Sequence, residues 1–305
     1  MYPLVIAISV LALYGLWQPS FPTEVSAENI LITNSIPGTV STFNTHGEIP
    51  QQTNVQEIDT NSYSAVVYDE KSKFKLWAKN ENDIRSIASL TKLMTALVFI
   101  NHNPGWEKIV QITDEDHRDG NKAYLFLGDR LTVKNLFYTG LIASDNTAIT
   151  TLVRSTGLTE EEFVNEMNQT AIRLRLKKTH FVEPTGLDSN NQSSAYDLIR
   201  LALIAFENDD IQNALKISSY NYNTENGKEI KVITTNDILR AAGSKDHTML
   251  AGKTGYLPQA GYCFVGWFEE DENRIITVVL GAPESEDRFT ETEKLVKWAF
   301  QSFSW

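Results

Sequence analysis

Three short motifs in a fixed order constrain what this chain can fold into more than any other feature. Ser89 is followed by Lys92 one helical turn later, Ser144 and Asn146 flank a single residue, and Lys-Thr-Gly occupies 253–255. A serine hydroxyl is a poor nucleophile at neutral pH, so it needs a base beside it. Each motif alone is common by chance, but the ordered trio is typical of a serine acyl-transfer site whose base is an amine. The fold must therefore bring three remote segments into one pocket.

Composition is that of an ordinary globular protein, with 42% hydrophobic and 22% charged residues among 305. The length allows one large domain or two modest ones. A formal net charge of −12 argues against nucleic acid or anionic lipid surfaces as main partners. The single cysteine, Cys263, excludes an internal disulfide and any multi-cysteine metal site, and its apolar strand predicts a core residue. The histidines have no metal-ligand spacing, so no metal and no cofactor is implied.

The N-terminus predicts export. Residues 3–17 are almost continuously apolar, which is short for a bilayer span of roughly 20 residues, and Val25, Ser26 and Ala27 include the small residues that signal peptidase accepts. We interpret 1–27 as a signal peptide, with an uncleaved N-terminal membrane anchor or a buried helix as alternatives. Residues 28–61 are rich in Ser, Thr, Asn, Gln and Pro, which predicts a flexible linker. The catalytic domain is then 62–305, acting outside the cytoplasm and held at the membrane only if the N-terminus stays attached.

Periodicity within 62–305 predicts an α+β fold. Alternating apolar residues over 65–78 predict a hairpin, and strand character returns at 248–253, 262–268 and 274–280. Between them, apolar residues at helical spacing over 90–98, a capping-box pattern at 159–162 and a helix start at Ser194 predict helices, and a last helix follows over 291–303. We therefore expect one antiparallel sheet built from both ends of the domain, with a helical region inserted.

Ser89 is the predicted nucleophile and Lys92 its base. Residues three apart on a helix are neighbours, so the amine reaches the hydroxyl. A partly buried lysine near another positive charge has a lowered pKa, and Lys253 can supply that charge. An exposed helix that happens to carry Ser and Lys is the alternative, but the leucine and methionine stripe beside Ser89 indicates a buried helix.

Ser144 and Asn146 have two interpretations that can both hold. The Ser144 hydroxyl can relay a proton between Lys92 and the leaving amine, while the Asn146 amide binds a peptide carbonyl or orients Lys92. The alternative is that Ser144 and Asp145 simply cap the helix that begins near Asn146.

The Lys-Thr-Gly run on a predicted strand supplies the substrate side of the site. Lys253 supports the Ser144 relay, Thr254 can hydrogen-bond a substrate carboxylate, and Gly255 leaves room for a substrate backbone beside the strand. The backbone N–H groups of Ser89 and Tyr256 are the candidate oxyanion hole. A plain strand ending in a glycine turn is the alternative for this motif.

With the stretches around them, these residues resemble the S11 family of D-alanyl-D-alanine carboxypeptidases and endopeptidases. The similarity covers about 62–305 and is carried by 87–96, 128–133, 179–187 and 260–263. It implies a penicillin-recognising (β-lactamase/transpeptidase-like) fold, a peptidoglycan peptide as substrate, an acyl-enzyme on Ser89, and β-lactams as covalent inhibitors. It also implies that Arg288 helps to bind the terminal carboxylate; the alternative is a solvated arginine among acidic neighbours.

Two departures from the family pattern matter. The family usually has glycine at the position of Asp145, and Ser144-Asp145-Asn146 reads more like a class A β-lactamase. Glu183 before Pro184 would then suggest a deacylating base, but its spacing to Leu187 does not fit that motif, so we leave Glu183 out of the catalytic set. The chain also ends soon after the last helix, so we expect no extra C-terminal β domain and no C-terminal anchor.

The sequence thus predicts a serine-type D-Ala-D-Ala carboxypeptidase acting on peptidoglycan stem peptides. A DD-endopeptidase on cross-links, a class A-like β-lactamase, and a binding module that never turns over peptide are the alternatives.

Overall fold

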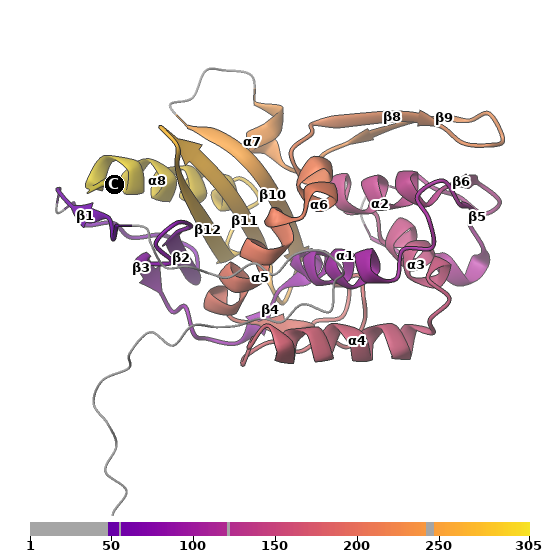
Figure 1. Cartoon of the computed structure of the whole chain (residues 1–305), viewed down its shortest axis with the longest axis horizontal. Helices are drawn as coiled ribbons and strands as arrows, with labels where there is room; N and C mark the ends of the chain where they lie inside the picture. The colour runs from indigo at the N-terminus through magenta and orange to yellow at the C-terminus, as the bar shows by residue number, and fades with distance from the viewer. Residues whose placement is uncertain (1–47, 55, 121–122, 242–246) are drawn as a thin grey trace, which may run out of the picture.

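The computed structural model describes residues 48–54, 56–120, 123–241 and 247–305 (Figure 1). The predicted signal peptide and most of the predicted linker lie outside these residues. Among the described helices, none is both long enough and apolar enough to cross a membrane.

A five-stranded antiparallel sheet forms one half of the molecule (Figure 1). Its strand order is β10-β11-β12-β2-β3, so the N-terminal hairpin pairs with the C-terminal meander as predicted. The register aligns Val66 with Val278 and Gly255 with Cys263. The strands are β2 (Ser64–Asp69), β3 (Lys75–Lys79), β10 (Thr248–Leu257), β11 (Gly261–Glu270) and β12 (Asn273–Ala282).

Helices occupy much of the chain between β3 and β10, and a last helix follows β12. The 3-10 turns are η1 (Ala88–Thr91) and η2 (Asp114–Asp116). The α-helices are α1 (Lys92–Asn101), α2 (Val133–Ile142), α3 (Asn146–Ser155), α4 (Glu160–Arg173), α5 (Ala195–Glu207), α6 (Asp209–Leu215), α7 (Asp237–Arg240) and α8 (Asp287–Ser302). Within the described residues, small two-stranded sheets join β1 (Gln51–Gln52) to β13 (Phe303–Ser304), β4 (Arg85–Ser86) to β7 (Gln192–Ser193), β5 (Ile109–Gln111) to β6 (Arg130–Thr132), and β8 (Ser219–Asn223) to β9 (Glu229–Ile233).

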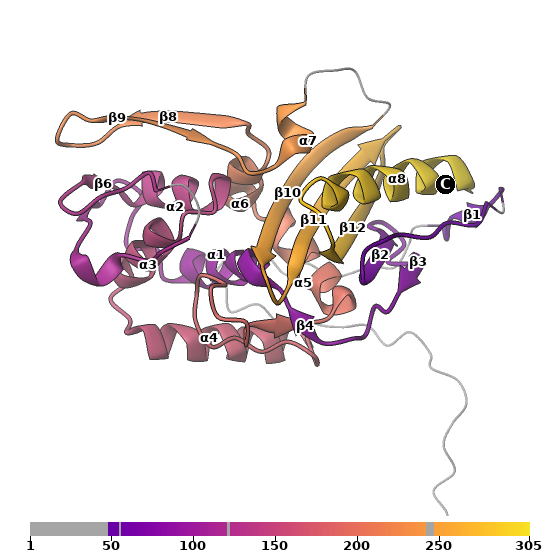
Figure 2. The same cartoon turned by 180° about the vertical axis from the view of Figure 1, so that it is seen from behind.

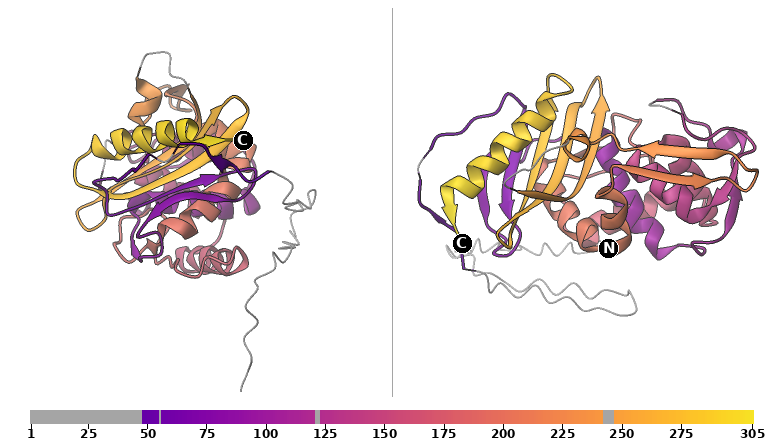
Figure 3. Two further views of the ribbon diagram at one scale, coloured as in Figure 1. Left: turned by 90° about the vertical axis from the view of Figure 1, so that its left-hand side faces the viewer. Right: turned by 90° about the horizontal axis from the view of Figure 1, so that it is seen from above.

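The sheet is apolar on both faces because each face is covered. Helix α8 lies across one face and α5 contacts the other, as Figures 2 and 3 show. Side chains alternate along a strand, so Val66 and Val278 face the α5 side while Ala65 and Val279 face α8. These buried strands therefore read as nearly continuous apolar runs in the sequence.

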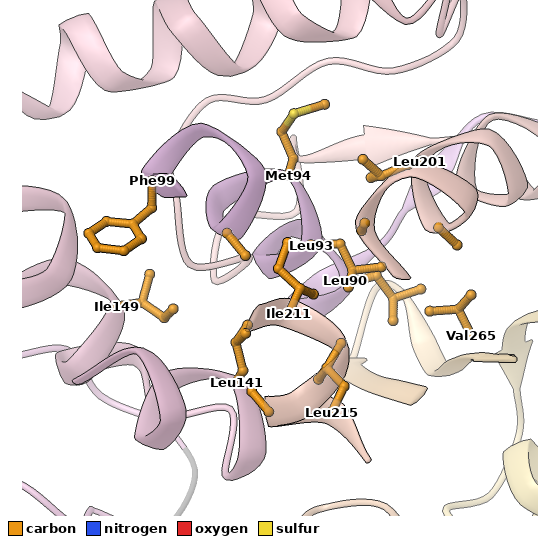
Figure 4. Packing of buried hydrophobic residues seen from close by; sticks show 14 of the residues in the cluster. Leu90, Leu93, Met94, Phe99, Leu141, Ile149, Leu201, Ile211, Leu215 and Val265 are labelled. Atoms are coloured by element: carbon orange, nitrogen blue, oxygen red, sulfur yellow. The ribbon is translucent and has the colours of Figure 1, made fainter. Parts of the chain in front are cut away.

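Helix α1 lies in the middle of the larger core (Figure 4). Leu90, Leu93 and Met94 are fully buried, and Ile211 and Leu215 of α6 lie close by. Burial of each such side chain contributes about 1.5–3 kcal/mol to stability. The helix that begins with the predicted base is thus held from several sides, as the apolar stripe predicted.

Local capping signals are confirmed. The side chain of Thr159 accepts from Glu162 N at the start of α4, and the Glu162 carboxylate accepts from the Thr159 N–H in return. Ser194 accepts from Asp197 N at the start of α5. Both satisfy backbone donors that a helix start leaves free, so these helices begin where the sequence predicts.

The part of the predicted linker that the structure describes makes contacts. β1 pairs with β13, the indole N–H of Trp298 donates to Gln56 O at 2.8 Å, and Lys294 Nζ donates to Asp59 O at 2.6 Å. Packing therefore starts before Ser62. The composition did not reveal this because the contacts use backbone oxygens of the segment rather than apolar side chains.

Candidate active site

Ser89 and Lys92 face each other across the start of α1. Ser89 lies in the 3-10 turn η1 and is partly exposed. Lys92 is the first residue of α1, and its side chain is fully buried. Lys92 Nζ lies 3.0 Å from Ser89 Oγ. Ala88, just before the serine, has φ +46°, a conformation that costs free energy for a residue with a side chain and that clusters at functional sites.

Two acceptors hold the amine of Lys92. Asn146 Oδ1 lies 2.7 Å from Nζ, and the backbone oxygen of Thr185 lies 2.5 Å away. The orientation of the Asn146 amide follows from its other contact, because its Nδ2 donates to Asp119 O at 3.0 Å. A neutral amine has two N–H donors and one lone pair. Since both donors go to oxygens that only accept, the lone pair is left for the hydroxyl hydrogen of Ser89.

Burial makes that neutral form available. It lowers the pKa of the Lys92 ammonium to about 7, although the carboxylates of Glu183 and Asp145 act in the opposite direction. We expected the charge of Lys253 to lower this pKa, but loss of hydration is the cause. Lys253 is itself buried, and burial followed by the charge of Lys92 lowers its pKa well below the usual value.

A second serine–lysine pair lies beside the first. Lys253 Nζ is 2.9 Å from Ser144 Oγ and donates also to Thr254 O at 3.0 Å. Asp145 caps α3, its side chain accepting from Ala148 N at 2.8 Å, so the capping interpretation is correct for Asp145. Ser144 has φ +58°, a second residue with a side chain in the left-handed region at this site.

The Lys-Thr-Gly segment of β10 packs against η1, the turn that carries Ser89. A Cβ on Gly255 would lie 2.9 Å from Ile87 O and 3.3 Å from Ser89 N, so only glycine allows this approach. β10 is the edge strand of the described sheet and continues to Leu257, so the motif does not end a strand. Edge strands can pair with an extended peptide.

Side chains from β10, β11 and α8 line the next part of the site. Tyr256 is 48% exposed, and its ring stacks on that of Tyr262 with centroids 4.2 Å apart. Arg288, in the first turn of α8, donates to Gly255 O at 3.3 Å and to Ser285 Oγ at 3.3 Å. The arginine is partly buried beside the motif rather than solvated among its acidic neighbours.

Sequence reasoning missed several groups that contact the predicted residues, among them Thr185 and Thr235. The Thr185 carbonyl bonds Lys92 as described, and Thr235 shares a 2.5 Å hydrogen bond with the Thr254 hydroxyl. Residues 179–187 carry part of the family resemblance, so the sequence indicated that this loop matters. It did not indicate that the Thr185 carbonyl accepts from Lys92. Thr235 gave no signal of its own.

Cys263 is fully buried in β11, and burial raises the pKa of its thiol to about 11. It is a core residue, as predicted. In the described part of the chain, no group of three or more His, Cys, Asp or Glu side chains is arranged to hold a metal ion.

Solved structures with the same fold define the class of protein. A penicillin-binding protein D2 from Listeria monocytogenes, in its cefotaxime-bound form, superposes with a TM-score of 0.70 at 29% identity, covering 80% of this chain and 99% of that one. A Streptomyces DD-transpeptidase superposes with a TM-score of 0.75 at 24% identity, covering 81% and 100%. The fold is the α+β, penicillin-recognising fold.

Sequence comparison identifies the family. The family model described as D-alanyl-D-alanine carboxypeptidase matches residues 51–284, and the chain belongs to this family, S11. A D-alanyl-D-alanine carboxypeptidase of Bacillus subtilis, DacF, is 31% identical over 81% of this chain and 64% of its own length. A D-alanyl-D-alanine endopeptidase of Haemophilus influenzae is 32% identical over 66% of this chain and 68% of its own. The chain thus spans about two thirds of the length of these relatives.

Proposed function

We propose that this protein is a serine-type D-alanyl-D-alanine carboxypeptidase that removes the terminal D-alanine from peptidoglycan stem peptides. The contact that carries the proposal is the 3.0 Å approach of a buried amine, Lys92 Nζ, to the hydroxyl of Ser89, with both amine donors already engaged. Family membership supplies the substrate class, because the family and its relatives are named for this bond.

Acylation begins when the Ser89 oxygen attacks the carbonyl carbon of the penultimate D-alanine. Lys92 takes the hydroxyl proton, and the N–H groups of Ser89 and Tyr256 stabilise the oxyanion. As the C–N bond breaks, Ser144 passes a proton to the departing amine and regains one from Lys92, with Lys253 holding the Ser144 hydroxyl in place. Free D-alanine leaves an ester on Ser89.

Water then attacks the ester carbonyl and gives a proton to Lys92. The Ser89 oxygen leaves with a proton, which restores the starting state. A β-lactam enters the same acylation step, but its amine stays tethered to the acyl group, so the ester persists. β-Lactams are thus expected covalent inhibitors.

Substrate binding uses the edge of β10. The peptide runs antiparallel to 253–257, the hydroxyl of Thr254 donates to the terminal carboxylate, and the charge of Arg288 supports that contact. Asn146 accepts from Lys92 and donates to Asp119 O, which supports the role of orienting Lys92.

The proposed substrate is extracytoplasmic, and so is the proposed site of action. In this proposal residues 1–27 act as a signal peptide or N-terminal membrane tether and 62–305 as the catalytic domain. Residues 28–61 act as a linker whose described end already packs on that domain. A pulse-chase of the secreted form with N-terminal sequencing tests the cleavage.

Cross-link hydrolysis is a second candidate, because an endopeptidase is among the relatives. A β-lactamase is disfavoured, since Glu183 is occupied by backbone donors and is not free to activate water.

Labelling with a fluorescent penicillin tests the nucleophile. Ser89→Ala is expected to abolish covalent labelling while the protein stays folded, and the exposed Ser304→Ala is the matched control that labels as the wild type does. Covalent labelling of the Ser89→Ala protein would contradict the proposal. Mass spectrometry of products from a pentapeptide and from a cross-linked dimer then separates carboxypeptidase from endopeptidase, and rapid turnover of penicillin would indicate a β-lactamase.

A further inference from the structure

The carboxylate of Glu183 is the centre of a tight loop. Its Oε2 accepts from the backbone N and the Oγ1 of Thr185, both at 2.6 Å. Its Oε1 accepts from Gly186 N at 2.5 Å and from Asn191 Nδ2 at 2.6 Å. Both oxygens are therefore engaged by donors of the protein itself, which leaves this group no capacity to act as a base toward water.

The outer side of the same loop faces α1. The Pro184 oxygen accepts from Thr95 Oγ1 at 2.6 Å, and the Thr185 oxygen accepts from Lys92 Nζ at 2.5 Å. A Cβ on Gly186 would overlap the backbone of Ala88, so the loop lies directly on the nucleophile turn. Backbone donors thus point inward to Glu183 and backbone acceptors point outward to α1.

One peptide group joins Glu183 to Lys92. The Thr185–Gly186 peptide gives its N–H to Glu183 and its C=O to Lys92. A trans peptide is planar, with its N–H and C=O on opposite sides, so fixing one end aims the other. A hydrogen bond to a carboxylate also polarises the amide and strengthens its oxygen as an acceptor.

The charged groups facing Lys92 come from three directions. Glu183 lies across the loop and Asp145 at the start of α3, and both favour the ammonium form of Lys92, while Lys253 lies on β10. Of these groups, Glu183 alone bonds to the peptide that receives an N–H of Lys92.

We propose that Glu183 is a positioning residue for the reaction at Ser89. Acting through the Thr185–Gly186 peptide, it fixes one N–H of Lys92 so that the lone pair of Nζ points to Ser89 Oγ. The inference rests on the proposed acyl transfer. It assigns Glu183 a role in acylation, whereas the comparison with class A β-lactamases suggests a base for deacylation.

The test measures the acylation rate constant of the full protein with a penicillin between pH 5.5 and 9. Glu183→Gln keeps the size of the side chain but replaces one carboxylate oxygen with an NH₂ group. Because the backbone N–H groups of Thr185 and Gly186 point at this side chain, one donor loses its acceptor and the Thr185–Gly186 peptide is expected to rotate. The rate constant at its plateau is expected to fall about 10- to 100-fold, as for other losses of a supporting hydrogen bond. Removal of the carboxylate also lowers the pKa of Lys92, so the acid limb of the profile moves to lower pH.

Asn191→Ala is the matched loop control. It removes hydrogen bonds on the far side of Glu183 and keeps the carboxylate, so it is expected to lower the melting temperature while leaving the acid limb in place. Equal rates and equal acid limbs in Glu183→Gln and Asn191→Ala would overturn the inference. If wild-type protein is not acylated at all, the proposed function fails, whatever the variants do.

Glu183→Asp covers the case in which Glu183→Gln does not fold. The shorter side chain keeps the charge but withdraws an acceptor from Gly186 N. Acylation is expected to slow while the acid limb stays, and a wild-type rate in this variant would overturn the inference.

Discussion

Two lysines in this site have no hydration to keep them charged. Lys92 and Lys253 are each at most 1% exposed. Loss of hydration disfavours the ammonium form of each, and each nevertheless has an oxygen acceptor within 3.0 Å. A neutral amine with fixed donors is what proton abstraction requires, so the same burial that destabilises the fold suits Lys92 to the proposed role of base.

Stability should therefore rise with pH between 7 and 9. The folded pKa of Lys92 is about 7, below that of an unfolded lysine, so the unfolded chain binds one more proton across this window. Each such lysine adds up to ~1.4 kcal/mol of unfolding free energy per pH unit. Lys92→Met should show a smaller slope, measured by urea unfolding at pH 7, 8 and 9.

The exposed Lys71→Met is the control for that slope and should keep the wild-type value. Cys263 acts in the opposite direction at higher pH. Burial raises the pKa of its thiol to about 11, so above pH 9 the unfolded chain loses this proton first and the free energy of unfolding falls. The window therefore ends at pH 9. An unchanged slope in Lys92→Met would contradict the account of a neutral Lys92.

The reaction itself should depend on the same group. Lys92→Ala is expected to lower the penicillin acylation rate by about 10²–10⁴-fold, the usual contribution of a general base. In wild-type protein the rate should rise with pH and level off above about 7, since the base must lose its proton first. Stopped-flow measurement of acylation gives both quantities, and an unchanged rate in the variant would refute the role of base.

At the scale of elements, two segments pack closely against η1, the turn that carries Ser89. Gly255 of β10 closely approaches Ile87 and Ser89, and Gly186 closely approaches Ala88 and Ser89. Each contact is between backbone atoms, where a side chain would not fit. The turn η1 is therefore held in an unusual backbone conformation by its neighbours rather than by its own sequence.

Gly255→Ala should separate β10 from η1. The added Cβ would lie 2.9 Å from Ile87 O, so the strand must shift, at a cost of about 1–3 kcal/mol in stability. Penicillin acylation should fall by at least about tenfold because Thr254 and the Tyr256 N–H move with the strand. Urea unfolding and acylation kinetics on the same sample measure both effects.

Gly227→Ala is the companion variant in the β8–β9 turn. This glycine has φ +82° and open space around it, so alanine costs about 1 kcal/mol from backbone strain alone. Its acylation rate should equal that of the wild type. A similar loss of rate in both variants would mean that stability, not the position of β10, controls the site.

Elements with strong local signals were predictable, although one of them was missed. The hairpin of β2 and β3, the capped start of α4 and the three C-terminal strands follow from periodicity and from Thr159 with Glu162. The hairpin of β8 and β9 was missed although it too has a local signal, because more and less exposed residues alternate along both strands and Asn226-Gly227 lies in the turn. The contact between Ser89 and Lys92 was predictable because the two residues lie one helical turn apart.

Long-range contacts made by backbone atoms could not be predicted from the sequence. Thr185 bonds Lys92 through its carbonyl, which every residue type has, so its identity carries no information about that contact. The same holds for Gln56 and Asp59, whose backbone oxygens receive side chains of α8. The positions of Ser144 and Lys253 in one site were predictable only from the motifs taken together.

At the scale of the whole molecule, the residues of the candidate site come from several helices and strands rather than from one. Ser89 and Lys92 come from the start of α1, Ser144 from the turn before α3, and Lys253 from the sheet. One buried apolar cluster runs through these helices and the α5 side of the sheet, including Leu93, Ile149 and Val265. No part of the site can keep its geometry once that shared cluster opens.

Loss of acylation should therefore coincide with loss of secondary structure. In a urea series, penicillin labelling and far-UV circular dichroism of the wild type should give the same midpoint. Leu93→Ala removes a fully buried side chain from the shared cluster and should cost about 2–5 kcal/mol. Both midpoints should then fall together while the acylation rate in dilute buffer stays near that of the wild type, because Leu93 does not touch the reacting atoms. Labelling that disappears well before the dichroism signal would mean instead that the helical region separates from the sheet in a distinct step.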